Sequence, residues 1–281
     1  MNISSAYNNE EAVWLAGMIY QAYQLFEERE VNLPGGFEIR LIIRALAGVE
    51  EPSEEVFGFL AESQDQIVVV FRGTRTFQDN ESDTDLYQVP YPYVRDAGRT
   101  HRGFTCIYLS ARDDLIKQLN ELSTSKKLFV AGHSLGGALA TLAALDIAVN
   151  TPFKQPAVYT YGSARTGDPA FAARFDQIVT NSFRIVNVHD IIPTLPARAY
   201  PPPFTNDGLY YKHVKKKIPL SFQFNSVAVR NHEIVCYFHK LRQRSPRFTD
   251  ALCMDNPGFC PDTELCAPFT GVCSPEEEDE E

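Results

Sequence analysis

Apolar side chains recur along the chain at two spacings, which predict alternating helices and strands. Positions three or four residues apart are apolar in residues 9–27 and 104–122, a spacing typical of amphipathic helices. Short apolar runs at 67–72, 158–162 and 183–188 are typical of buried strands. Because helices and strands alternate from residue 67 onward, we expect an α/β fold with a mostly parallel central sheet flanked by helices.

Other segments extend this predicted order at both ends. The runs at 37–45 and 56–61 predict an antiparallel start to the sheet. A short helix is expected at 168–175, and another at 231–241 with Asn231 as its N-cap. No repeat is visible along the chain.

The composition changes near residue 245, where Pro, Cys and Asp become frequent and the chain ends in an acidic run at 276–281. We therefore expect an α/β-hydrolase domain at 1–245 and a Cys-containing C-terminal extension with an acidic tail at 246–281. An acidic run of this kind is typical of a solvated, disordered end.

Four of the six cysteines crowd into the extension, and the gaps between them lack the Cys-x-x-Cys pairs of common zinc sites. We favour disulfides over a metal site for this group, which comprises Cys253, Cys260, Cys266 and Cys273. Disulfides fit a secreted protein. The N-terminus lacks the features of a secretory signal, which as written points to the cytoplasm, so the compartment stays open.

Charge argues against a nucleic-acid partner, and hydropathy argues against a transmembrane helix. Thirty-six acidic residues oppose 26 basic ones, for a formal net charge of −10, so a nucleic-acid partner is not expected. No apolar run approaches the ~18 residues of a transmembrane helix, so no membrane span is expected. The densest basic run, at 215–217, is interpreted as a solvated loop.

Ser134 lies at the centre of a Gly-x-Ser-x-Gly sequence, between an apolar run that predicts a strand and one that predicts a helix. A sharp strand-to-helix turn of this kind presents a serine at the top of a sheet, where a base can reach it. The sequence therefore predicts a nucleophilic serine. The alternative, a glycine-rich turn with an inert serine, remains open on this motif alone.

A serine hydroxyl needs an imidazole to take its proton and a carboxylate to orient that imidazole. In the α/β-hydrolase arrangement the acid follows the serine, at the end of a later strand. Asp190 meets this condition. Asp168 fits a helix N-cap better, and Asp207 a turn beside Gly208.

Three histidines follow Asp190 and could supply the base. His213 lies in a predicted strand, where packing or hydrogen bonding is its expected role, and His239 lies well inside a predicted helix. His232 begins that helix directly after a loop, where a side chain can reach across the sheet. We choose His232 as the base.

A serine hydrolase also needs hydrogen-bond donors for the oxyanion of its tetrahedral intermediate. One donor is expected to be the backbone N–H of Leu135, the residue after the nucleophile. The second should come from a loop after an earlier strand, and Thr74 at the end of FRGT (71–74) occupies such a place.

Together these segments resemble the class 3 (fungal-type) lipases over roughly residues 55–240. The motifs that carry the resemblance are FRGT (71–74), DTDL (83–86), HRGF (101–104), GHSLGGA (132–138), YGSARTGD (161–168), NVHDIIP (187–193) and NHEIVCYF (231–238). The resemblance implies Ser134, Asp190 and His232 as the triad and Thr74 and Leu135 as the oxyanion hole. It also implies that Asp85 supports the hole.

The segment after Thr74 departs from what the resemblance implies. In this family it forms a lid that usually carries a tryptophan near the position of Ser82, whereas here it is polar and acidic, with Phe77 as its main apolar residue. A polar lid has little apolar face to bury at an oil–water interface. We therefore expect weak interfacial activation and a preference for short or soluble esters.

The function expected from the sequence is carboxylic ester hydrolysis through an acyl-enzyme, with acylglycerols as the favoured substrates. The alternatives are a feruloyl-type or short-chain esterase, a phospholipase A1, and a silent hydrolase scaffold used for binding. No cofactor or metal is expected, since this chemistry needs none. Transient contact with a lipid interface and the oligomeric state stay open.

Overall fold

The computed structural model describes residues 6–48, 52–74, 86–200, 208–223 and 228–266. Within these ranges a seven-stranded sheet forms the centre of the molecule, in the order β1-β2-β3-β6-β7-β8-β11. Its strands are β1 (Glu38–Ala47), β2 (Ser53–Glu62), β3 (Gln66–Phe71), β6 (Lys127–His133), β7 (Ala157–Tyr161), β8 (Ser182–Asn187) and β11 (Lys217–Leu220).

The sheet has an antiparallel edge and a parallel body. β1 pairs with β2, and β2 with β3, in antiparallel register, while β3, β6, β7, β8 and β11 are parallel neighbours. The mostly parallel α/β fold and the antiparallel start are therefore both confirmed. Because the carboxyl ends of the parallel strands lie at one edge of the sheet, the loops that follow them meet there.

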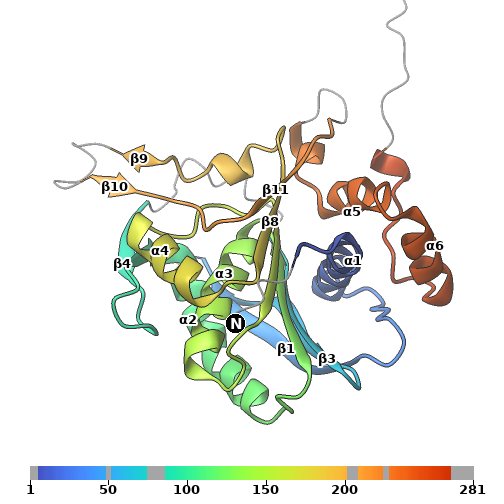
Figure 1. The fold of residues 1–281 in the computed structure, drawn as a ribbon, viewed down its shortest axis with the longest axis horizontal. Helices are drawn as coiled ribbons and strands as arrows, with labels where there is room; N and C mark the ends of the chain where they lie inside the picture. The colour runs from blue at the N-terminus through green and yellow to red at the C-terminus, as the bar shows by residue number, and fades with distance from the viewer. Residues whose placement is uncertain (1–5, 49–51, 75–85, 201–207, 224–227, 267–281) are drawn as a thin grey trace, which may run out of the picture.

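Helices cover both faces of the sheet (Figure 1). One face carries α2 (Arg102–Asn120), α3 (Leu135–Asn150) and α4 (Pro169–Ile178), and the other carries α1 (Asn9–Phe26), α5 (Ile234–Arg242) and α6 (Pro246–Asp255). β3 shows why the sheet is buried on both sides: Val69 belongs to the apolar cluster under the first group, and Val68 and Val70 belong to the cluster under the second.

Shorter elements border this core. They are β4 (Gln88–Pro90), β5 (Arg99–His101), β9 (Ala199–Tyr200), β10 (Leu209–Tyr210), η2 (Ile192–Thr194), η3 (Ala228–Asn231) and η4 (Glu264–Cys266). β4 pairs with β5, and β9 with β10, each as a separate two-stranded sheet.

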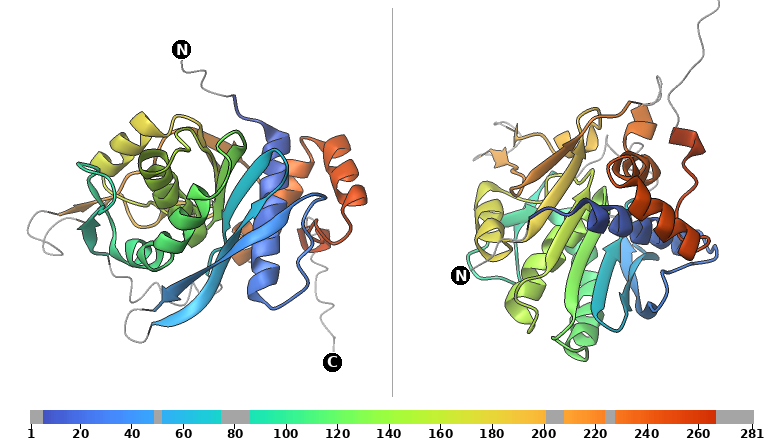
Figure 2. Two further views of the ribbon diagram at one scale, coloured as in Figure 1. Left: turned by 90° about the horizontal axis from the view of Figure 1, so that it is seen from below. Right: turned by 45° about the vertical axis from the view of Figure 1, so that its right-hand side comes forward.

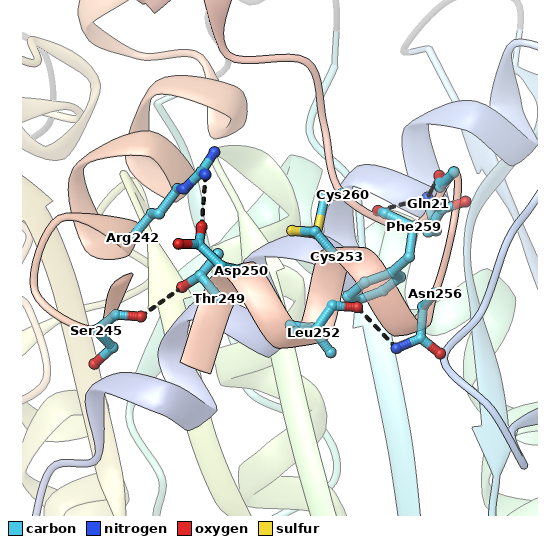
Figure 3. The surroundings of a disulfide bond; sticks show 11 residues. Gln21, Arg242, Ser245, Thr249, Asp250, Leu252, Cys253, Asn256, Phe259 and Cys260 are labelled. Carbon is cyan, nitrogen blue, oxygen red and sulfur yellow. Dashed lines mark hydrogen bonds and ion pairs between the residues drawn. A yellow bond between two sulfur atoms is a disulfide. The ribbon is translucent and has the colours of Figure 1, made fainter. Parts of the chain in front are cut away.

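The described part of the C-terminal extension packs against α1 and α5. Figure 2 shows α1 between the sheet and these late helices. The Gln21 amide of α1 donates to the carbonyls of Gly258 and Phe259 at 2.9 and 2.8 Å, as Figure 3 shows for Phe259. A Cβ added at Gly17 would lie 2.6 Å from the Phe259 ring, so helix and extension are in close contact.

Two disulfides hold the extension. Cys253 bonds to Cys260 across the end of α6 (Figure 3), and Cys236 in α5 bonds to Cys266. The preference for disulfides is confirmed for these residues, although the second bridge recruits Cys236 from the body of the chain. Cys273 lies outside the described residues.

Two local predictions were wrong, and one helix was missed. The N-cap of α5 is Glu233, whereas Asn231 ends η3 and uses its carbonyl to accept a hydrogen bond from the Asn187 amide. His213 lies outside any strand. The basic run at 215–217 is exposed, as expected, and only its last residue, Lys217, belongs to β11. α6 was not expected, because the chain after about residue 245 was interpreted from its Pro, Cys and Asp content as an extension without regular elements.

Candidate active site

Ser134 lies in a strained turn between β6 and α3. Its backbone angles are φ 59° and ψ −126°, a combination that costs a non-glycine residue on the order of 1–3 kcal/mol. Its N–H donates to the Tyr161 carbonyl at 2.9 Å, and its own carbonyl accepts from Gly137 N–H at 3.0 Å. The strained conformation is thus fixed by the neighbouring strand and by the first turn of the helix.

The start of α3 lies directly on the end of β3, where only glycine fits at position 136. A Cβ added at Gly136 would lie 2.3 Å from the Arg72 carbonyl oxygen and 2.4 Å from that of Phe71. This close approach brings the loop after β3, which holds Thr74, beside the serine. The two segments expected to form the oxyanion hole are therefore neighbours.

Asp190 and His232 are brought together from two separate loops. Asp190 follows β8, and His232 lies between η3 and α5. The His232 Nδ1 lies 2.7 Å from Asp190 Oδ2, and the other carboxylate oxygen, Oδ1, accepts the Ile192 N–H at 2.9 Å. The Asp190 side chain is fully buried, whereas His232 retains 16% of its side-chain exposure.

A fourth side chain, not found from the sequence, completes this pair. The Tyr237 hydroxyl of α5 donates to Asp190 Oδ2 at 2.7 Å and accepts the Asn187 N–H at 3.0 Å. Burial and the Asp190 charge raise the pKa of Tyr237 well above its ordinary value, so the phenol is a permanent donor. Its place five residues after His232 was the one signal available in the sequence.

Three polar atoms in this region are buried without a hydrogen-bond partner in the part of the chain that the structure describes: Ser134 Oγ, His232 Nε2 and Thr74 Oγ1. Unpaired buried polar atoms are costly and uncommon in proteins. These atoms belong to the three residues expected to be nucleophile, base and oxyanion donor. Their occurrence together is typical of a site that binds a polar ligand.

The N-terminus of α3 contributes to the electrostatics of this site. Leu135 is the first residue of that sixteen-residue helix, so its N–H is one of those left unpaired at a helix start, where the helix dipole favours negative charge. Thr74 lies on the loop beside Ser134. Asp85, Phe77 and Ser82 lie outside the described residues.

The residues passed over in the sequence have other partners. His213 Nε2 lies 2.7 Å from the Pro193 carbonyl, and burial, followed by the charge of Arg184, lowers its pKa to about 3. Asp168 caps α4 by accepting the Phe171 N–H at 2.7 Å, as expected. His239 lies in the last turn of α5, and Asp207 lies outside the described residues.

The loop after Asp190 is held by its carbonyl groups. His213 binds the Pro193 carbonyl, while the Arg165 guanidinium Nη1 donates to the carbonyls of Thr194 and Pro196. Both basic side chains are largely buried, so these bonds form away from water. The position of Asp190 therefore rests on a loop anchored at three successive points.

No group of three or more His, Cys, Asp or Glu side chains in the described residues is arranged to hold a metal ion. No helix in these residues combines the length and apolar character needed to cross a bilayer.

Comparisons with known proteins agree with the geometry. Residues 68–200 match the family model described as lipase (class 3). This segment contains Thr74, Ser134 and Asp190 but ends before His232.

Individual relatives point the same way. A lipase from Rhizomucor miehei is 35% identical over 148 residues, a match that covers 50% of this chain and 40% of that protein. Phospholipase A1 EG1 of rice, Oryza sativa subsp. indica, is 27% identical over 282 residues, covering 82% of this chain and 64% of that protein. Matches to the first relatives thus span less than half of those proteins' length.

A solved structure shows the same fold. The Rhizomucor miehei lipase in complex with its propeptide superimposes with a TM-score of 0.61 at 24% identity, covering 77% of this chain and 68% of that one.

Proposed function

We propose that this chain, which belongs to the class 3 lipase family, is a serine carboxylic ester hydrolase with Ser134, Asp190 and His232 as its catalytic triad. One observation carries the proposal. His232 is held to the buried Asp190 through Nδ1, while its Nε2 and the Ser134 hydroxyl are both buried and unpaired. In the neutral tautomer that donates from Nδ1 to Asp190, Nε2 is the acceptor for the serine proton.

In the first half of the reaction, Ser134 Oγ attacks the carbonyl carbon of the ester while His232 Nε2 takes the hydroxyl proton. The tetrahedral intermediate then collapses, the bond to the alcohol oxygen breaks, and His232 returns the proton to the leaving alcohol. Water repeats these steps on the acyl-enzyme and releases the acid. Asp190 stabilises the imidazolium that forms in each half.

The negative charge of each intermediate falls on the former carbonyl oxygen. We assign its donors to the N–H groups of Thr74 and Leu135, and we expect the Thr74 hydroxyl, which is buried without a partner, to add a third. The N-terminus of α3 favours the charge at the same point. Support of the hole by Asp85 remains an expectation from the sequence.

Acylglycerols are the substrates we propose first, because the family is one of lipases. Short or soluble esters are favoured instead by the polar composition of residues 75–85, which offer little apolar surface to a lipid interface. Phospholipase A1 activity is supported by the name of the rice relative, whose match extends over most of this chain.

A labelling experiment tests the reaction class. A fluorophosphonate should modify Ser134 in the wild-type protein, and Ser134→Ala should abolish both labelling and ester hydrolysis without loss of folded structure. Ser125→Ala, at an exposed serine in the turn before β6, is the matched control and should keep full activity. Near-wild-type hydrolysis by Ser134→Ala would overturn the triad. Absence of labelling in the wild type would favour a silent scaffold.

A substrate panel tests the specificity. Triacylglycerols of several chain lengths, a phosphatidylcholine, a p-nitrophenyl butyrate and a methyl ferulate should be compared at equal enzyme concentration. If soluble esters are preferred, the rate of tributyrin hydrolysis should change smoothly with tributyrin concentration as its solubility limit is passed. A sharp rise in rate at that limit would contradict the weak interfacial activation we expect.

A further inference from the structure

A chain of hydrogen bonds runs behind the site and joins the oxyanion loop to the loop of the base. The Gly73 N–H donates to the Tyr23 hydroxyl at 2.8 Å, and that hydroxyl lies 2.8 Å from His133 Nδ1. The other ring nitrogen of His133, Nε2, lies 2.6 Å from the carbonyl oxygen of His232. Three segments far apart in the sequence thus meet through two side chains.

The chemistry of the groups fixes the direction of each bond. The His232 carbonyl can only accept, so His133 Nε2 carries a hydrogen and donates it. In the neutral ring Nδ1 is then an acceptor, and it receives the hydroxyl hydrogen of Tyr23. The Tyr23 oxygen in turn accepts from Gly73, so all three bonds point from the oxyanion loop toward His232.

Burial keeps His133 in the neutral form that this direction requires. The residue is 3% exposed, and desolvation, followed by the neighbouring His232, lowers its pKa well below the ordinary value. The two imidazole rings lie 4.5 Å apart between centroids. The backbone of the base therefore rests on a rigid, uncharged partner.

The oxyanion loop is also held from its other side. Arg72 Nη1 donates to the Gly73 carbonyl at 2.7 Å. Because the carbonyl and the following N–H of a trans peptide point in opposite directions, this bond sets the direction of the Thr74 N–H. A Cβ added at Gly73 would lie 2.6 Å from Ser134 Cβ and 2.7 Å from the Tyr23 hydroxyl oxygen, so loop, nucleophile and Tyr23 are in direct contact.

We propose that Tyr23 and His133 are positioning residues that fix the Thr74 oxyanion donor relative to His232. The inference rests on the proposed hydrolase function and assigns a role in it to α1, a helix outside the segment that the family model matches. Neither side chain transfers a proton to substrate. Their effect is geometric, through the Gly73 N–H, one residue before Thr74, and through the His232 carbonyl.

α1 is anchored well enough to serve as a reference point for these two loops. Its Ala12 carbonyl accepts a bond of 2.6 Å from the Tyr161 hydroxyl, and its Gln21 side chain binds the extension after α6. Tyr23 lies two residues after Gln21 and about three helical turns after Ala12. Its hydroxyl is therefore held by the helix and does not depend on the loops it binds.

Tyr23→Phe tests the proposal, because it removes the hydroxyl and keeps the ring, which lies edge-on to His133 with centroids 5.9 Å apart. We expect kcat for p-nitrophenyl butyrate to fall about 10–100-fold with KM changed less than about twofold, as for a small misplacement of catalytic groups. The affinity of a boronic acid, which forms a tetrahedral adduct on Ser134, should fall in parallel. Tyr20→Phe, one turn earlier on α1, is the control and should match the wild type.

A double variant separates a relay from two independent packing effects. If Tyr23 and His133 act through one chain of bonds, the two substitutions should not add. The kcat of the Tyr23→Phe/His133→Gln double variant should then be less than about twofold below that of the less active single variant. The relay would be overturned if the two losses of kcat multiplied in the double variant. It would also be overturned if Tyr23→Phe kept the wild-type kcat, or if its loss of activity equalled its loss of folded protein. An inactive, unlabelled wild type would instead contradict the proposed function.

Discussion

Tyr237 and His232 share one oxygen atom of Asp190, each at 2.7 Å from Oδ2. The phenol hydroxyl and the imidazole thus approach the carboxylate from the same helix and the turn before it, while the Ile192 N–H holds Oδ1. The acid is fixed at both oxygens, which leaves His232 one orientation in which to bind it.

Removal of the Tyr237 hydroxyl should reduce stability more than activity. In Tyr237→Phe the buried Asn187 N–H loses its partner, which costs about 1–3 kcal/mol, while the hydrogen bond between Asp190 and His232 is retained. We expect a lower midpoint in urea and a fall in kcat of less than about tenfold. The exposed Tyr210→Phe is the matched control. An unchanged midpoint would contradict the role of this hydroxyl.

Asp190→Asn should reduce activity more than stability. The amide keeps the size of the side chain, but its NH₂ group disfavours the Nδ1–H form of His232, so the serine loses its acceptor. By analogy with the Ser-His-Asp template, kcat should fall by about 10⁴. Esterase assays together with the thermal midpoint separate this effect from unfolding. Activity within tenfold of the wild type would remove Asp190 from the triad.

His213 should make the protein sensitive to acid. Its folded pKa, lowered to about 3, lies below the ordinary value of 6.5, so the unfolded chain binds a proton between these values and the folded chain does not. Stability is therefore greatest above pH 6.5 and falls with decreasing pH toward 3, by at most about 1.4 kcal/mol per pH unit.

His213→Gln removes this titration. Urea unfolding at pH 7.0 and 5.0 should show a smaller loss in the variant than in the wild type. His189→Gln, at an exposed histidine, should lose as much as the wild type. Equal losses in all three proteins would show that His213 is not the group responsible.

The two disulfides should differ in how much they contribute to the free energy of unfolding. Cys236–Cys266 spans 30 residues and Cys253–Cys260 spans 7, so chain entropy predicts contributions of about 3.5 and 2.5 kcal/mol. Each pair replaced by alanines, with free energies of unfolding measured by urea, gives the comparison. A larger loss on removing the shorter loop would contradict the entropic ranking.

The sequence was sufficient for the fold class and for candidates at the ends of strands. Ser134, Asp190 and His232 were identifiable because catalytic side chains in this fold follow parallel strands or precede helices, positions that apolar runs mark clearly. The structure then showed that Asp190 and His232 meet. The roles of all three remain proposals that the experiments above address.

The supporting side chains could not be found in this way. Tyr23 and Tyr237 each occupy an apolar position of a helix, where the sequence pattern indicates only a role in core packing. The groups that their hydroxyls bind lie far away in the sequence. α6 was missed because its apolar residues are only partly buried and its stabilisation comes from contact with α1 and from a disulfide. Such elements depend on tertiary contacts, which local patterns do not contain.

The contact of α1 with α5 and α6 has a consequence for the order of assembly during synthesis. A ribosome makes Tyr23 long before it makes His232, Tyr237 and Phe259, so α1 can pack on the early strands while the surface that later contacts α5 and α6 stays uncovered. Ser134 and Asp190 are complete in the nascent chain before His232 exists. The proposed ester hydrolysis would therefore begin only after nearly the whole described chain has been translated and folded.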